Sequence, residues 1–259
     1  MINFFRRIRK KMADDNKPLK YMRYAVGEVV LVVIGILIAL QINNWNEEKK
    51  NNKAEIKILQ HLVEDLTETK EEIVRINIKL LLQLGSISNL VNYIENDVPI
   101  DNSNLGVMNT PVSGIFNSTN TTINFIESEG MGILRNDSIR TIISNIYERF
   151  GNIHKREDLT ESRFYHRIIS FRNKYFEVKT KDLSALAGTA VDSTRWSKVF
   201  PSTVIKVVDS IGLKKDMTFL NTLHDLRSFY QFRQLYLDRT ANQIDDVRSK
   251  VSNEISRMQ

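Results

Sequence analysis

Residues 21–42 read YMRYAVGEVVLVVIGILIALQI, and Val29 to Leu40 are successive residues without a polar side chain. As a helix, this stretch would be about 33 Å long, close to the thickness of the hydrocarbon core of a bilayer. A helix of a globular protein usually keeps a polar face, which this stretch lacks. The sequence therefore predicts a transmembrane helix, and the alternative is a buried helix of a soluble protein.

The charges on either side of this stretch predict its orientation. Against only Asp14 and Asp15, the residues before Tyr24 carry eight basic side chains, Arg6, Arg7, Arg9, Lys10, Lys11, Lys17, Lys20 and Arg23. Residues 47–53 carry a balanced mixture of charges, so the positive-inside rule places the N-terminus in the cytoplasm. No A-x-A cleavage site follows, which favours an uncleaved signal anchor. We therefore expect a basic cytoplasmic tail over 1–20, the anchor over 21–42 and an exported domain over 43–259.

The net charge of +6 does not indicate nucleic-acid binding. Without the eight basic residues named above, and without Asp14, Asp15 and Glu28, the chain retains 29 basic and 28 acidic residues. The exported part is thus nearly neutral and lacks the basic surface that phosphate binding requires. The tail's charge is explained by attraction to anionic lipid. The chain also has no cysteine, which excludes disulfides and thiolate chemistry.

Two long heptad patterns predict an all-α bundle after the anchor. Ten of the twelve a and d positions of the first pattern are apolar: Ile56, Leu59, Val63, Leu66, Lys70, Ile73, Asn77, Leu80, Leu84, Ile87, Val91 and Ile94. A second pattern closes the chain: Leu223, Leu226, Tyr230, Arg233, Leu237, Thr240, Ile244, Val247, Val251, Glu254 and Met258. We expect these two long helices to pair antiparallel within one chain, and a parallel coiled coil between chains is the alternative. Lys70 and Asn77 are either polar residues that fix the register of the helix pair or positions where the packing opens to water.

The middle of the chain predicts shorter elements. Pro and Gly residues indicate loops over 96–120, followed by a short helix over 123–126 that ends at Gly130 or Gly132. Asn136 to Ser138 can cap a longer helix that carries apolar residues as far as Tyr175. Residues 183–194 are polar, and their pattern does not indicate a particular secondary structure. Residues 196–211 predict a further short helix, although their Val-rich end is also compatible with a strand.

Two features of the anchor are candidate functional sites. Glu28, Gly35 and Ala39 share one helix face, and Gly35-x-x-x-Ala39 is a spacing of small residues that permits close helix approach. A helix-association face is one interpretation. The other is that Glu28 reaches water among the cytoplasmic headgroups and the glycine is incidental. Trp45, among polar amides, is typical of an interfacial anchor.

No sequence motif indicates catalysis or a cofactor. The four histidines, His61, His154, His166 and His224, do not occur at metal-ligand spacings. The serine-nucleophile, phosphate-loop and dinucleotide patterns are absent. Adjacent acidic pairs such as Glu71-Glu72 point to different faces of a helix and are read as solvated. We therefore expect a protein that is not an enzyme and binds neither metal nor cofactor.

Three segments resemble a family of unknown function whose members are single-pass membrane proteins, widespread in Bacteroidota. They are FFRRIRKK at 4–11, YAVGEVVLVVIGILIALQINNWNEEKK at 24–50 and TTINFIESEGMGILRNDSIRTIISNIYERF at 121–150. In the third segment Glu129-Gly130 replaces the family's usual Ser-Gly, and Arg149-Phe150 replaces a terminal Tyr-Tyr. The resemblance implies a bacterial inner-membrane protein with a periplasmic domain, and it transfers no catalytic residue.

These observations lead to two functional hypotheses. The first is a scaffold or adaptor that sits in the lipid bilayer and docks an envelope protein or a second copy of itself. The second is a helical bundle that senses a ligand and signals through the transmembrane face containing Glu28.

Overall fold

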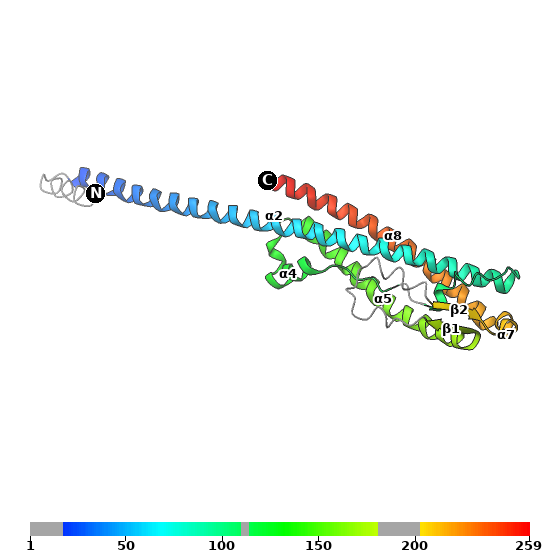
Figure 1. The fold of residues 1–259 in the computed structure, drawn as a ribbon. Helices are drawn as coiled ribbons and strands as arrows, with labels where there is room; N and C mark the ends of the chain where they lie inside the picture. The colour runs from blue at the N-terminus through cyan, green and yellow to red at the C-terminus, as the bar shows by residue number, and fades with distance from the viewer. Residues whose placement is uncertain (1–17, 110–113, 181–202) are drawn as a thin grey trace, which may run out of the picture. The chain divides into compact units, whose positions relative to one another are not determined.

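The structure, a computed structural model, describes residues 18–109, 114–180 and 203–259 (Figure 1). The described elements, in chain order, are helices α2 (Pro18–Glu95), α3 (Gly106–Asn109) and α4 (Thr121–Glu129), the 3-10 turn η1 (Met131–Ile133), helix α5 (Asp137–Tyr175), strands β1 (Phe176–Thr180) and β2 (Thr203–Val207), and helices α7 (Ser210–Lys215) and α8 (Met217–Met258). The predicted all-α class is confirmed, with the addition of one two-stranded hairpin. The chain divides into two compact units, residues 1–57 and 58–259.

The first unit consists, in its described part, of the N-terminal portion of α2. This helix is long and apolar enough to cross a membrane by length and composition. The large apolar side chains between Val29 and Ile42 are 47–72 % exposed, so no other described part of the chain covers them. Such exposure is expected of side chains that face lipid rather than a protein core.

In the second unit, α2 buries the predicted apolar face. Leu59, Leu66, Ile73, Leu80 and Ile87, all d positions, are fully buried, whereas the a positions Ile56, Val63 and Leu84 are half-buried. The buried face is wider than the predicted heptad pattern, since it also includes residues one position before an a site: Leu62, Ile76 and Leu90. A face of this width is expected where a helix packs against more than one neighbour.

Helices α2 and α8 pair antiparallel, as predicted. Three polar contacts recur in a constant register: Lys70 with Asp245, Asn77 with Asp238, and Ser88 with Arg227. Each step forward along α2 is matched by an equal step backward along α8. Lys70 Nζ lies 2.6 Å from Asp245 Oδ2, and Asn77 Nδ2 donates to Asp238 Oδ1 at 2.7 Å. The two polar a positions of the sequence pattern therefore act within one chain, as register contacts at the partly exposed margin of the pair.

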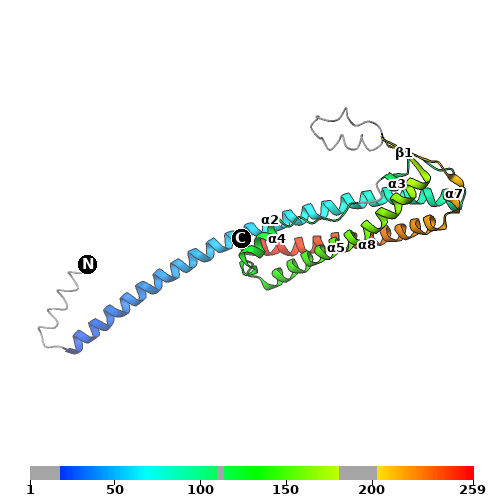
Figure 2. The same ribbon diagram turned by 90° about the horizontal axis from the view of Figure 1, so that it is seen from below.

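Helix α5 completes a three-helix bundle with α2 and α8 (Figures 1 and 2). Its N-terminus is capped as predicted, because the Asn136 side chain accepts hydrogen bonds from the backbone amides of Ser138 and Ile139. Ring contacts join its C-terminal part to α8, Phe164 with Phe229 and Phe171 with Phe219. The predicted short helix before it is present as α4, and Gly130 at its C-cap has φ of 95°.

The hairpin corrects one sequence prediction. Residues 203–207 form strand β2, not part of a helix over 196–211, and pair antiparallel with β1, from Phe176 with Val207 to Thr180 with Thr203. The β-branched run Thr203-Val204-Ile205 favours a strand, which is the alternative that the sequence left open. Ile205 is buried, while α3 and α7 lie near the hairpin at the end of the bundle where α2 ends (Figure 2). Residues 183–194 lie outside the described residues.

Asp216 joins this end of the bundle together. Its side chain caps α8 by accepting from the amides of Thr218 and Phe219, and it also accepts from the Tyr175 hydroxyl and the Lys174 ammonium group. The hydrogen bond from Tyr175, followed by those from Phe219 and Lys174, lowers the pKa of Asp216 below its ordinary value of 3.8. The ionised carboxylate is therefore the form that stabilises the fold.

This shift predicts a specific acid sensitivity. A lowered folded-state pKa contributes stability that is complete above pH 3.8 and is lost as the pH falls through the folded pKa. Asp216→Asn keeps a good capping residue but removes the charge, so we expect it to cost about 1 kcal/mol at pH 6. The difference between variant and natural protein should shrink as the pH falls below 3.8. Thermal unfolding of the full chain in detergent, followed by circular dichroism from pH 6 to pH 2, measures it; a constant difference would contradict the assignment.

Candidate functional site

Of the predicted membrane residues, Gly35, Ala39 and Trp45 are exposed on α2, and Glu28 is half-buried. A Cβ added at Gly35 would meet no atom within 4 Å outside its own helical turn, and Ala39 is exposed. The helix surface is thus open to close approach by another helix at this point. Trp45 is 64 % exposed, and Lys49 Nζ lies 5.6 Å from the centroid of its ring. The association face that includes Glu28 and the anchoring role of Trp45 stay predictions.

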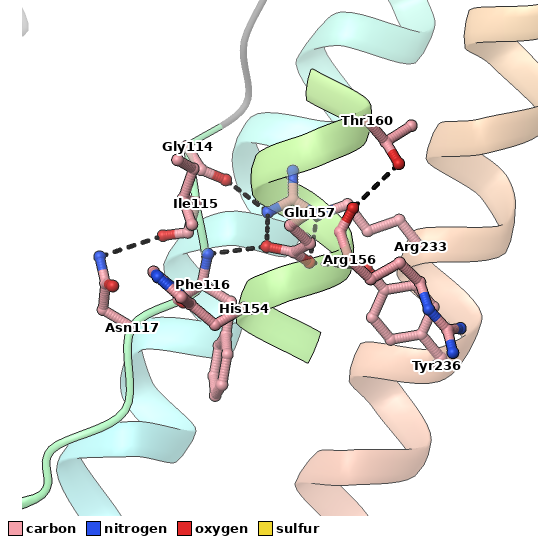
Figure 3. A network of polar contacts seen from close by, with 10 residues as sticks. All are labelled: Gly114, Ile115, Phe116, Asn117, His154, Arg156, Glu157, Thr160, Arg233 and Tyr236. Atoms are coloured by element: carbon pink, nitrogen blue, oxygen red, sulfur yellow. Dashed lines mark hydrogen bonds and ion pairs between the residues drawn. The ribbon is translucent and has the colours of Figure 1, made fainter. Parts of the chain in front are cut away.

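A second candidate site is a buried ion pair in the centre of the bundle, between Glu157 on α5 and Arg233 on α8 (Figure 3). Both side chains are completely buried. Arg233 Nε donates to Glu157 Oε1 at 2.7 Å, and a terminal guanidinium nitrogen donates to Oε2 at 2.7 Å. The Tyr236 hydroxyl also donates to Oε1, at 2.6 Å. Burial, the nearby Glu157 charge and this hydrogen bond raise the pKa of Tyr236, which keeps its hydroxyl protonated as a donor.

The ion pair also holds the loop that connects α3 and α4. Arg233 donates to the carbonyl of Gly114, and the amide of Phe116 donates to Glu157 Oε2 at 2.7 Å. His154 Nδ1 lies 3.0 Å from the Phe116 carbonyl oxygen (Figure 3). The paired charges therefore satisfy backbone groups that would otherwise be buried without partners.

Helix α2 fastens the same loop from the other side. The Thr69 hydroxyl oxygen accepts from the amide of Thr119 at 3.0 Å, and Asp65 Oδ2 accepts from the amide of Thr122 at 2.7 Å. Thr69 is completely buried and Asp65 is 8 % exposed. Buried polar groups of α2, α5 and α8 thus converge on one segment, residues 114–122, which we call the fastened loop.

The fastened loop forms one wall of a hollow of about 490 Å³. Helices α4 and α5 supply the other walls, and the lining is rich in amides, hydroxyls and carboxylates: Asn117, Ser118, Asn120, Asn124, Glu127, Ser144, Glu148 and His154, with Phe116, Ile123, Tyr147, Phe150 and Gly151. Burial, together with the charge of Asp65, raises the pKa of Tyr147, so its hydroxyl is neutral and donates to the Thr119 carbonyl. The hollow therefore presents amide, hydroxyl and imidazole groups, two carboxylates and the half-buried ring of Tyr147.

Among the described residues no group of three or more His, Asp or Glu is placed to hold a metal ion. His61 is exposed and lies 3.1 Å from Glu64, and His224 lies 3.1 Å from Glu95. Only His154 of the four histidines lines the hollow.

Sequence reasoning did not identify the ion pair or the hollow. Arg233 did appear in the second heptad pattern as a charged residue at an apolar position, and its burial requires a partner. That signal identifies a buried cation, but it does not single out Glu157 among the acidic residues of α5. Lys70 and Asn77, which the sequence did single out, contact α8 and do not line the hollow.

A family model described as a family of unknown function, DUF6090, matches residues 28–221. This range includes the apolar segment from Glu28, the fastened loop and all of α5. Neither a curated protein nor a solved structure matches the chain.

Proposed function

The chain belongs to DUF6090, a family of unknown function, and on that premise we propose that it is a non-enzymatic docking protein anchored in the membrane by α2. In this proposal the anchor lies in the bacterial inner membrane, the basic tail is cytoplasmic and the bundle is periplasmic. The exposed apolar segment after Glu28 and the basic residues before it support this orientation. The partner is a protein of the envelope.

The observation that carries the proposal is a second apolar face on α2, opposite the core. Val74, Ile78, Leu81 and Leu82 are 51–69 % exposed and recur at helical spacing, so they form one stripe. Their neighbours Ile73, Ile76 and Leu80 fill the core, which leaves the stripe unused by the described bundle. Leu81 lies one turn after Asn77, whose side chain contacts Asp238, so the stripe flanks the junction of α2 and α8. Exposed apolar side chains in such a row indicate an interaction surface.

The size of the stripe indicates what it binds. A stable protein interface uses about 20–30 residues on each side, and this stripe offers four. The spacing i, i+4, i+7 and i+8 gives α2 a narrow apolar row, which one amphipathic helix can cover by packing side by side with it. Glu71 and Arg75 border the stripe and are exposed, as expected for the polar rim of such a contact. The proposed occupant is therefore one amphipathic helix of an envelope protein.

Crosslinking from the stripe tests this proposal. Because the chain contains no cysteine, Leu82→Cys gives a single attachment point for a thiol-reactive photo-crosslinker on the full-length protein in its native envelope. We expect one adduct with a different polypeptide, reduced at least about tenfold by adding Ile78→Glu, since a buried charge at this point costs more than 1.4 kcal/mol. Treatment of cells with a membrane-impermeant maleimide, after the outer membrane is made permeable, should block the adduct if the bundle is periplasmic.

The matched control is Ile211→Cys on α7. Ile211 is 70 % exposed, as accessible as Leu82, but it lies outside the stripe. The same adduct from both positions would contradict a specific surface. An adduct that contains only a second copy of this chain would contradict a different envelope protein as partner and indicate self-association instead.

A further inference from the structure

The hollow beside the fastened loop has the features of a binding site for a small molecule. Its volume of about 490 Å³ falls within the range of ordinary ligand pockets, about 300–1,000 Å³. Its lining comes from two helices and a loop, and each of these is held by the bundle core through Ile123, Phe150 or Phe116, which are buried. Sites of this kind are set largely before the ligand arrives.

Burying Glu157 and Arg233 is energetically costly, which suggests that holding the fastened loop in place serves a function. Removing a carboxylate and a guanidinium group from water costs several kcal/mol per ion, and an apolar pair of similar volume would often stabilise the fold as well or better. In this bundle Arg233 donates a hydrogen bond to the Gly114 carbonyl, and Glu157 accepts one from the Phe116 amide. Asp65 and Thr69 do the same at Thr122 and Thr119. The common result is a rigid wall, which lowers the entropy that a ligand must overcome on binding.

The lining defines the charge of the ligand. Glu127 and Glu148 are exposed at the hollow, and neither forms an ion pair with another described residue. No lysine or arginine lines it, and the one histidine, His154, donates through Nδ1 to the Phe116 carbonyl, so the two carboxylates are the charged groups that face a ligand most directly. A protonated amine is the complementary group.

The remaining lining defines the rest of the molecule. Three asparagine amides and two serine hydroxyls offer both donors and acceptors, which match a ligand with several hydroxyl groups. Tyr147, which is half-buried and is backed by the buried ring of Phe150, adds an aromatic surface against which the carbon face of a ring can pack. From this combination we infer that the hollow binds a small hydroxylated amine of the amino-sugar type. This role goes beyond docking and uses a different surface.

Three probes of equal ring size and different charge test the inference. Isothermal titration of the full-length chain in detergent, at a pH where the amine is protonated, should show saturable binding of glucosamine. Glucose should bind about tenfold more weakly, because one charge contact of about 1.4 kcal/mol is missing. Glucose 6-phosphate should not bind. No saturable binding of glucosamine, or equal binding of the phosphate, would overturn the assignment.

A pair of glutamate variants separates the site from general charge. Glu148→Gln should weaken glucosamine about tenfold and leave glucose unchanged. Glu129→Gln removes the same charge from an exposed residue of α4 that does not line the hollow, and it should leave both affinities unchanged. If both variants weaken glucosamine binding equally, the attraction is a diffuse electrostatic one, and the proposed site is wrong. Since Glu129, Glu148 and the probes lie away from the α2 stripe, failure here leaves the crosslinking test of docking intact.

Discussion

Replacement of Arg233 by methionine is expected to lower the free energy of unfolding by about 3–5 kcal/mol. The substitution keeps a long side chain but leaves the Glu157 carboxylate completely buried without its cation. It also removes the hydrogen bond to the Gly114 carbonyl, so the fastened loop loses one of its contacts. For a unit of this size the melting temperature should fall by roughly 2–4 °C per kcal/mol. Thermal and denaturant unfolding of the full chain in detergent measure the loss.

Two further variants test the cause. Arg239→Met makes the same chemical change at an exposed position of α8 and should cost less than about 0.5 kcal/mol. In Glu157→Gln/Arg233→Met the buried negative charge is gone, and the amide can still pair with the Tyr236 hydroxyl and the Phe116 amide. The double variant should therefore recover part of the loss. If it is less stable than Arg233→Met alone, the unpaired carboxylate is not the source of the instability.

Phe219→Ala is expected to have an effect of similar size, about 3–5 kcal/mol. Phe219 is completely buried in the first turn of α8, and its ring centroid lies 4.9 Å from that of Phe171 and 6.1 Å from that of Tyr175. It also meets Phe176 at the start of β1, at 6.3 Å. The truncation leaves a cavity where α5, α8 and the hairpin meet, which these rigid elements cannot fill.

Phe232→Ala is the matched control for this cavity. Phe232 is on the same helix but is 59 % exposed, so its truncation should cost well under 1 kcal/mol. Differential scanning calorimetry of both variants in the same detergent compares them directly. Equal melting temperatures for Phe219→Ala and Phe232→Ala would mean that the aromatic cluster contributes little to stability.

The local patterns of the sequence predicted much of the fold correctly. The a and d residues of the second heptad pattern from Leu223 to Val251 are buried on α8 as predicted, including Arg233 and Thr240. The Asn136 cap and the Gly130 C-cap are in the predicted places. These features succeed because helix periodicity and capping depend on residues within a few positions of one another. Strand β2 was an alternative that the sequence left open, but its pairing with β1 was not predicted, because residues 181–202 separate the two strands.

The sequence by itself therefore determined a membrane-length apolar helix, its flanking charges, and two long helices with complementary apolar faces. Only the tertiary structure decided that Arg233 meets Glu157, that these charges hold residues 114–116, and that a polar hollow lies beside them. It also decided which apolar face of α2 is buried by the bundle and which remains as the stripe around Ile78. The physical reason is separation along the chain. Apolar periodicity depends on residues close together in the sequence. The partner of a buried charge is decided only when helices far apart in sequence pack together.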